Sequence, residues 1–140
     1  MTTTVLFDLD NTLVDSNSAK ALRDQRQWRT IAEHPELIRP FDLRPNTLVQ
    51  PHHVIAKLRR LGHRVGVITS SPREYAQPII SRYGIEPDVL IAYEDTRLHK
   101  PDPEPINAAL QRLGIDANHA CYVGDDPNDV EASFRAGVIS

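Results

Sequence analysis

The feature that most constrains this fold is a regular alternation of short apolar runs with longer amphipathic segments. The apolar runs occupy residues 4–9, 64–69, 88–92 and 120–123. Between and after them, segments of roughly ten residues carry apolar side chains at helical spacing, at 53–61, 73–83, 104–113 and 127–136. Such runs suit strands buried on both faces, and their alternation with helices implies a parallel sheet with right-handed crossovers. The sequence therefore predicts an α/β fold with three layers, in which helices cover both faces of a doubly wound parallel sheet.

Polar clusters follow three of these expected strands, and a lysine lies on a loop beside them. The clusters are Asp8 and Asp10, Thr69 and Ser70, and the group Asp125, Asp126 and Asp129, and the lysine is Lys100. Taken singly, they could be an Asp-rich turn, two helix caps and a surface lysine. Because the carboxyl ends of parallel strands share one edge, where open α/β sheets bind ligands, we expect the clusters to converge on one site.

Phosphoryl transfer needs the side chains that these clusters contain. A carboxylate can attack phosphorus, and a second carboxylate can protonate the leaving group and then activate water. A hydroxyl and a lysine can hold the phosphate oxygens. Several carboxylates repel one another unless a cation offsets them, and Mg²⁺ prefers oxygen ligands. Asp8 and Asp10 lie two positions apart and can both face one such cation, and Thr12 adds a hydroxyl next to them.

Residues 15–51 break the alternation and form the expected insertion. Residues 15–34 are polar and contain no proline, which predicts a helix capped by Ser16 or Ser18. Four prolines lie within the rest of the insertion, which indicates a loop or one short helix there. We therefore expect a single domain over residues 1–140, with the insertion as a small cap over the site.

Net charge, cysteine count and the lengths of apolar runs limit the partners and the cellular compartment that can be expected for this chain. The net charge of −3 offers no basic field for nucleic acid, so direct nucleic-acid binding is not expected. Cys121 is the single cysteine, which excludes an internal disulfide and fits a reducing compartment. No apolar run approaches the ~18 residues of a membrane span, and no basic segment followed by an apolar one marks a signal peptide. We expect a cytoplasmic protein without a membrane span, and its oligomeric state stays open.

Four stretches of the sequence carry a resemblance to a known family. They are Asp8-Leu9-Asp10-Asn11-Thr12, Thr69 at its strand end, Lys100-Pro101 and Gly124-Asp125-Asp126-Pro127-Asn128-Asp129. In this order they resemble the motifs of the haloacid dehalogenase superfamily of hydrolases, most of which are Mg²⁺-dependent phosphatases. The resemblance covers nearly the whole chain except 15–51, and its first and fourth motifs are specific in combination. It implies the Rossmann-like core of that superfamily.

The resemblance also implies a role for each of these residues. Asp8 is the nucleophile, Asp10 is the general acid and base, and Lys100 steadies the phosphoryl group and the nucleophile. Asp129 orients Lys100 or a metal-bound water, and Asp126, like Asp129, lies around the metal ligands without being one of them. The implied ligands of Mg²⁺ are Asp8, Asp10 and Asp125. The implied phosphate-binding residues are Asn11, Thr12, Thr69, Ser70 and Lys100.

The sequence departs from the family in two places. The insertion is shorter than the four-helix cap of many members, which should leave the site open for a larger substrate or for a partner that completes it. Substrate choice in the family depends mainly on the cap, and each candidate here could equally be ordinary helix surface. The candidates are Arg23, Arg26, Trp28 and Arg29. The chain also stops at Ser140, within an expected strand begun by Val138, so it is either truncated or a natural minimal form.

The favoured function is Mg²⁺-dependent hydrolysis of a small phosphorylated substrate through an aspartyl-phosphate on Asp8. Dehalogenases of the family attack carbon without the second acid, so Asp10 favours phosphate chemistry. A phosphomutase shares all four motifs but normally has a fuller cap. A non-catalytic or partner-dependent domain of a larger protein or complex stays open, although the intact acids and Lys100 favour catalysis. A phosphatase part of a larger protein that acts on a nucleic-acid end would need basic residues beside the site.

Overall fold

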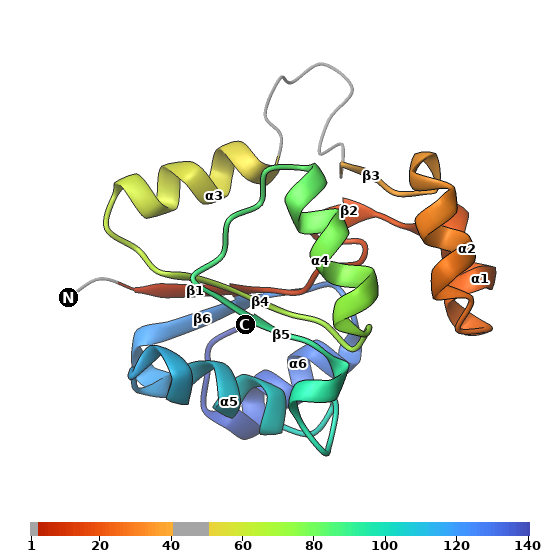
Figure 1. Ribbon diagram of the computed structural model, residues 1–140. Coiled ribbons are helices and arrows are strands. Elements are labelled where there is room, and N and C mark those ends of the chain that lie inside the picture. The colour runs from red at the N-terminus through yellow and green to blue at the C-terminus, as the bar shows by residue number, and fades with distance from the viewer. Residues whose placement is uncertain (1–2, 41–50) are drawn as a thin grey trace.

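The computed structural model describes residues 3–40 and 51–140, and its centre is a four-stranded parallel sheet. The strands are β1 (Thr4–Phe7), β4 (Val65–Ile68), β5 (Val89–Ile91) and β6 (Ala120–Val123). They lie in the order β5-β4-β1-β6 and Figure 1 shows them from the side. Val5 of β1 is in register with Val65 of β4 and Cys121 of β6, which sets the carboxyl ends of these three strands side by side.

Two helices cover each face of the sheet (Figure 1). Helices α3 (Pro51–Arg60) and α4 (Arg73–Arg82) lie on one face, and α5 (Glu104–Leu113) and α6 (Pro127–Ala136) lie on the other. Successive strand side chains point to opposite faces. Val65 and Val67 accordingly join the core with α4, whereas Ile68 joins the core with α5 and α6. This arrangement confirms the predicted three-layer fold. Among the described residues, none of the helices has the length and apolar character of a membrane span.

The expected strand at Val138 and Ile139 begins beside β6. Cys121 and Ile139 form a single parallel bridge. The Tyr122 N–H donates to the Ile139 carbonyl oxygen at 2.8 Å. The C-terminal residues therefore pair with the outer edge of β6 through a single bridge and do not form a full strand.

Short helices and strands follow β1 over residues 14–40. The elements are β2 (Val14–Asp15), a 3-10 turn (Asn17–Ala19), α1 (Lys20–Asp24), α2 (Trp28–Glu33), a second 3-10 turn (Pro35–Leu37) and β3 (Arg39–Pro40). β2 and β3 pair antiparallel, with Val14 opposite Pro40. We call residues 14–40 the insertion segment, and residues 41–50 of the expected insertion lie outside the described residues.

The prediction of one helix within residues 15–34 is wrong, because two short helices replace it. A break at 25–27 separates α1 from α2, and Arg26 within it has a φ of 57°. A left-handed residue commonly ends a helix, so the chain turns there. The expected caps are wrong as well. Ser16 precedes the first 3-10 turn without a side-chain hydrogen bond to it, and Ser18 lies inside that turn.

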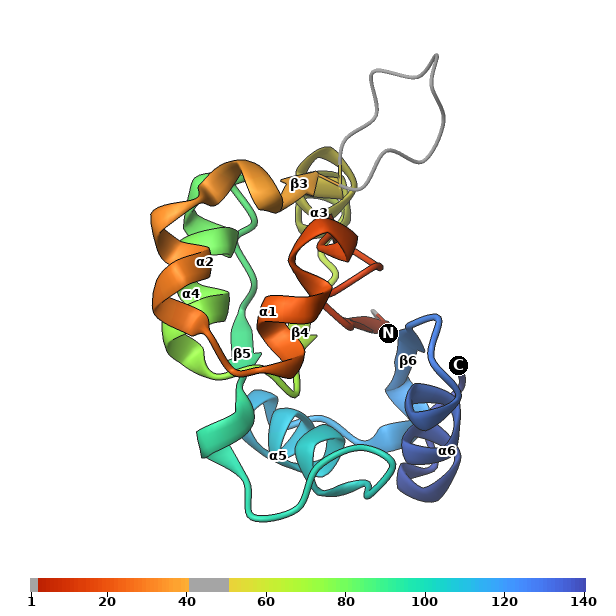
Figure 2. The ribbon, with the colours of Figure 1, turned by 90° about the vertical axis from the view of Figure 1, so that its right-hand side faces the viewer.

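The insertion segment packs against α4 at the carboxyl edge of the sheet (Figures 1 and 2). The Trp28 and Tyr75 rings lie 5.2 Å apart between centroids. Ile31 is buried in the same core as the apolar residues of α4. The Tyr83 hydroxyl donates to the Ile38 carbonyl oxygen. These contacts hold the segment beside the edge at which β1 and β4 end.

Candidate active site

A cavity of about 700 Å³ lies where the polar clusters meet at the carboxyl ends of the strands. The sequence-predicted site residues that line it are Asp8, Asp10, Asn11, Thr69, Ser70, Lys100, Asp125, Asp126 and Asp129. Thr12 does not line it, and its hydroxyl is buried without a hydrogen-bond partner within the described ranges. The clusters therefore converge on one place, as the order of a parallel sheet requires.

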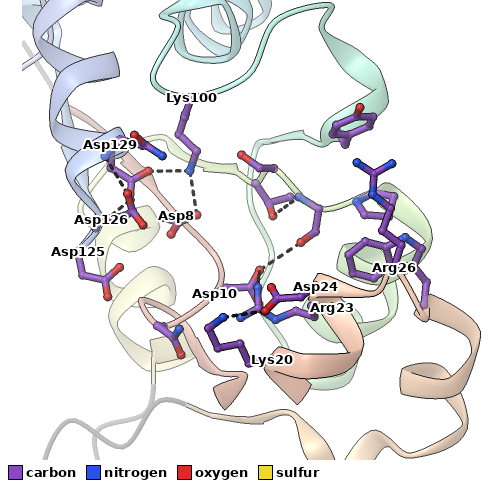
Figure 3. A pocket seen from close by; sticks show the side chains of 18 residues that line it. Asp8, Asp10, Lys20, Arg23, Asp24, Arg26, Lys100, Asp125, Asp126 and Asp129 are labelled. Atoms are coloured by element: carbon purple, nitrogen blue, oxygen red, sulfur yellow. Dashed lines mark hydrogen bonds and ion pairs between the residues drawn. The ribbon is translucent and has the colours of Figure 1, made fainter. Parts of the chain in front are cut away.

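Lys100 is the buried centre of this site (Figure 3). Its side chain is 7% exposed, and its Nζ lies 3.0 Å from Asp8 Oδ1 and 2.7 Å from Asp129 Oδ1. The ammonium group also donates to the Tyr122 hydroxyl at 3.0 Å and to the Ile68 carbonyl oxygen at 3.3 Å. Burial by itself lowers the pKa of Lys100, but the two carboxylates outweigh it and the pKa is raised. Lys100 therefore stays protonated and bridges Asp8 and Asp129.

Asp129 holds Lys100 in place. Its side chain is 2% exposed, its Oδ1 also accepts from the Tyr122 hydroxyl at 3.0 Å, and its Oδ2 accepts from the Asp126 N–H at 3.3 Å. Burial and the neighbouring carboxylates raise the pKa of Tyr122, so the hydroxyl keeps its proton. Gly124 leaves room for Asp129, because a Cβ there would lie 2.6 Å from its Oδ2. Both Asp129 oxygens are thus engaged by the protein.

Asp8 lies between Lys100 and the other acids. Its N–H donates to the Val123 carbonyl oxygen at 3.0 Å, which fixes it beside the end of β6. Burial raises the pKa of Asp8 to about 6, against the opposing effect of Lys100. Carboxylate oxygens of Asp8, Asp125 and Asp129 lie within 4.8 Å of one another. Three carboxylates here share one ammonium group, and such an excess of negative oxygen donors suits a hard divalent cation.

The carboxylate of Asp10 lies outside this cluster. Its Oδ1 accepts from the Tyr75 hydroxyl at 2.6 Å, and its Oδ2 accepts from the Ser71 hydroxyl at 3.3 Å. The Arg23 Nη1 of the insertion segment lies 3.6 Å from the same Oδ2. Burial and Asp10 raise the pKa of Tyr75, which keeps its hydroxyl a donor. Asp10 is therefore held by α4 and the insertion segment, and its expected part in a metal site stays a prediction.

The expected phosphate-binding residues differ in exposure. Thr69 is 4% exposed, and its Oγ1 accepts from the Ser71 N–H at 3.0 Å in the turn into α4. Ser70 is exposed. Asn11 has a φ of 59°, which asparagine tolerates, and its Oδ1 accepts from the Ser16 N–H at 3.4 Å. Thr69 and Asn11 therefore also shape the loops of the cavity.

Asp125 and Asp126 are neighbours with different surroundings. Asp126 is the N-cap of α6, where its side chain accepts from the Asn128 N–H at 2.8 Å. Asp125 is exposed and makes no hydrogen bond or ion pair within the part of the chain that the structure describes. Asp125 is therefore available to a ligand, whereas Asp126 stabilises the start of a helix.

Comparison with known sequences decides the family. A family model of haloacid dehalogenase-like hydrolases matches residues 26–140. The chain belongs to this family. It is 33% identical over 126 residues to an N-acetylmuramic acid 6-phosphate phosphatase of Pseudomonas aeruginosa, a match that covers 89% of this chain and 53% of that protein. A match to the pyrophosphatase PpaX of Bacillus velezensis is 33% identical over 107 residues and covers 75% and 46%, respectively. The chain spans about half the length of these curated relatives.

Solved structures of haloacid dehalogenase-superfamily hydrolases share the fold. One from Ehrlichia chaffeensis aligns with a TM-score of 0.71 over 99% of this chain and 86% of its own, at 19% identity. At this low sequence identity, the structural similarity shows a shared fold and no more. The family resemblance of the sequence and the Rossmann-like core that it implied are both confirmed.

Two tyrosines that lie outside the sequence motifs contribute to the site of this haloacid dehalogenase-like protein. Tyr122 lies in an apolar strand next to the fourth motif, and the need of a buried phenol for a partner could have indicated it. Tyr75 meets Asp10 only because α4 folds over the end of β1, which no local pattern reveals. Of the candidate specificity residues, Arg29 does not line the cavity; those that do are Arg23, Arg26 and Trp28.

Proposed function

We propose that this family member hydrolyses a small phosphorylated substrate, with Mg²⁺ as cofactor and an aspartyl-phosphate on Asp8 as intermediate. The observation that carries the proposal is the buried Lys100, which joins Asp8 to Asp129 beside a third carboxylate. Burying ions costs several kcal/mol each in effective terms, so a role in stability alone is a poor explanation for this group. The two relatives, which are named as a phosphatase and a pyrophosphatase, support the same class of chemistry.

The chemistry of the donor set fits Mg²⁺. Asp8 and Asp125 would hold the cation with oxygens that the protein leaves available, while Asp129 is engaged by Lys100 and its neighbours. Asp10, the third proposed ligand, would contribute an oxygen to the cation from its position beside α4. When bound, Mg²⁺ would neutralise the carboxylates and polarise the phosphoryl oxygens.

Asp8 would supply the attacking oxygen. Lys100 fixes its carboxylate, and the side chain is 14% exposed, so little water competes for it. With a pKa of about 6, Asp8 is mostly ionised at neutral pH, as a nucleophile must be. Attack on phosphorus forms an acyl phosphate and releases the ester oxygen, and water then hydrolyses the acyl phosphate. Lys100 would offset charge on the phosphoryl oxygens in both steps.

Asp10 would move the protons of both steps. As an acid it would protonate the leaving oxygen, and as a base it would then accept a proton from the attacking water. The Tyr75 and Ser71 hydroxyls orient its carboxylate, and Arg23 offsets its charge. The Asp10 side chain is therefore positioned by groups other than those that hold the nucleophile.

The remaining roles complete the proposal. Phosphate oxygens would be held by residues that line the cavity, namely Asn11, Thr69, Ser70 and Lys100. Thr12 would act only indirectly, through the loop after β1 in which its hydroxyl is buried. Residues 15–51 would serve as a reduced cap, and the single cysteine fits a cytoplasmic protein.

Hydrolysis of p-nitrophenyl phosphate tests the proposal. The wild type should release inorganic phosphate only with Mg²⁺, lose activity in EDTA and regain it when Mg²⁺ is restored. Asp8→Asn should lower kcat by about 10³-fold or more while keeping the circular dichroism spectrum, because the nucleophile alone is lost. Metal-independent turnover, or an Asp8→Asn variant with near-normal kcat, would contradict the mechanism. Transfer of the phosphoryl group to a second hydroxyl, without release of phosphate, would indicate a phosphomutase instead.

A further inference from the structure

The insertion segment gives the cavity a basic side, and Figure 3 shows Arg26 far from the acids of the fourth motif. Lys20, Arg23 and Arg26 all line the cavity. Lys20 Nζ pairs with Asp24 Oδ2 at 2.8 Å, and Arg23 Nη1 lies 3.6 Å from Asp10 Oδ2. Arg26 has no ion pair or hydrogen bond from its side chain within the described residues. Its positive charge is therefore uncompensated in a cavity whose other basic groups are paired.

Arg26 also occupies a backbone position that favours glycine. Its φ is 57°, its N–H donates to the Arg23 carbonyl oxygen at 3.0 Å, and the Gln27 N–H donates to the Leu22 carbonyl oxygen at 2.8 Å. These bonds close α1 around a left-handed residue, a conformation that glycine adopts without the steric cost of a Cβ. The fold of the segment does not require an arginine at this position, and the exposed Arg26 side chain lines the cavity, where it can meet a ligand.

We propose that Arg26 anchors a subsite for a second anionic group of the substrate, remote from the reacting phosphate. This rests on the proposed phosphatase function, which places the reacting phosphate at Asp8 and Lys100. A guanidinium group keeps its charge and can pair with a carboxylate or a phosphate through two parallel hydrogen bonds. Trp28 lines the same cavity and would contact the part of the substrate between its two anionic groups. The substrate class is thus a phosphomonoester that carries a second acidic group.

A matched series of substrates tests this subsite. The series consists of straight-chain alkyl phosphates of increasing length that end in a hydroxyl, a carboxylate or a second phosphate. With saturating Mg²⁺, the wild type should prefer an acidic end over a hydroxyl end by about tenfold or more in kcat/KM at one chain length. Arg26→Gly should abolish most of that preference, mainly through KM. The carboxylate and phosphate arms then identify which acidic group the subsite takes.

Two variants and a stability measurement separate binding from folding. Arg29→Ala is the matched control, because Arg29 is exposed on α2 and does not line the cavity, and it should keep the wild-type preference. Arg26→Lys should keep part of it, because the charge stays and the forked donor is lost. The Tm of Arg26→Gly should equal or exceed that of the wild type, since glycine accepts the left-handed φ.

The outcomes separate the subsite from the activity. If alkyl phosphates are hydrolysed but Arg26→Gly has the wild-type preference, or the wild type has none at any length, the subsite is wrong and the phosphatase function stands. If neither the series nor p-nitrophenyl phosphate is hydrolysed, the phosphatase function fails. In that event titration calorimetry with the acid-ended compounds decides about Arg26: a Kd that Arg26→Gly leaves unchanged overturns the subsite, and a weakened Kd supports it.

Discussion

The two sides of the cavity are built differently. On the core side, Asp8, Lys100 and Asp129 are at most 14% exposed, and Lys100 is held by groups from several elements of the fold. On the insertion side, Lys20 and Asp24 of one short helix pair with each other and, among the residues that the structure describes, with no other group, and 67% and 60% of their side chains are exposed. Substitution of a buried charged group leaves its partners buried and unpaired, which costs stability, whereas substitution within an exposed pair costs little.

This difference suits a division between reaction and substrate choice. The reacting atoms need partners fixed to within a fraction of an ångström, which strand ends and buried ion pairs provide. Recognition of the rest of a substrate can use exposed side chains on short elements that tolerate substitution. The core side would therefore carry the chemistry, and the insertion side would select the substrate.

The largest expected effect comes from a comparison of the two lysines. Lys100→Ala leaves Asp8 and Asp129 buried without their counter-charge, so it should lower the free energy of unfolding by about 3–5 kcal/mol. It should also lower turnover of p-nitrophenyl phosphate by about 10³-fold or more, corrected for the folded fraction. Lys20→Ala removes an exposed pair and should leave the unfolding midpoint nearly unchanged. Equal losses of stability in urea titrations of the two variants would show that the two sides do not differ.

The sequence predicts the core side well for a physical reason. Parallel strands end at one edge, so the order of the motifs suffices to bring Asp8, Thr69 and Asp125 together. The helices at 104–113 and 127–136 end as expected, because each is strongly amphipathic and is followed by a glycine with positive φ. Local pattern and global fold agree throughout this half of the molecule.

The insertion side follows no such rule. Arg26 takes a conformation that normally belongs to glycine or asparagine, so the sequence offers no signal for the break between α1 and α2. The partners of Asp10 come from Tyr75 and Arg23, and both depend on how the insertion segment and α4 pack. The burial of the Thr12 hydroxyl likewise depends on tertiary packing. Long-range contacts of this kind cannot be derived from periodicity.

The second comparison uses two exposed acids that line the cavity. Asp125→Ala removes a member of the carboxylate cluster and should weaken Mg²⁺ binding roughly tenfold or more, with little change in Tm without metal. Asp24→Ala disrupts the pair with Lys20 and should leave the Kd for Mg²⁺ within about twofold of the wild type, since Asp24 lies outside the cluster. Titration calorimetry with MgCl₂ measures both. A Kd unchanged by Asp125→Ala would move the ligand to Asp126 or Asp129.

The smallest expected effects come from two tyrosine hydroxyls, one for each side. The Tyr122 hydroxyl contacts Lys100 and Asp129, and the Tyr83 hydroxyl ties the insertion segment to the core through Ile38. Phenylalanine at either position should cost about 1 kcal/mol of stability, because each variant loses hydrogen bonding and keeps the ring.

Their kinetics should differ although their stabilities do not. Tyr122→Phe removes a partner of Lys100 and should lower kcat on p-nitrophenyl phosphate about tenfold. Tyr83→Phe leaves Lys100 and its partners untouched, so kcat on the same substrate should stay within about twofold of the wild type, since the loss is confined to the attachment of the insertion segment. If Tyr122→Phe loses the stability but keeps kcat, the two carboxylates alone hold Lys100 for catalysis. In that case ion pairing alone positions Lys100 for catalysis, and the Tyr122 side chain contributes packing and hydrogen bonding to stability.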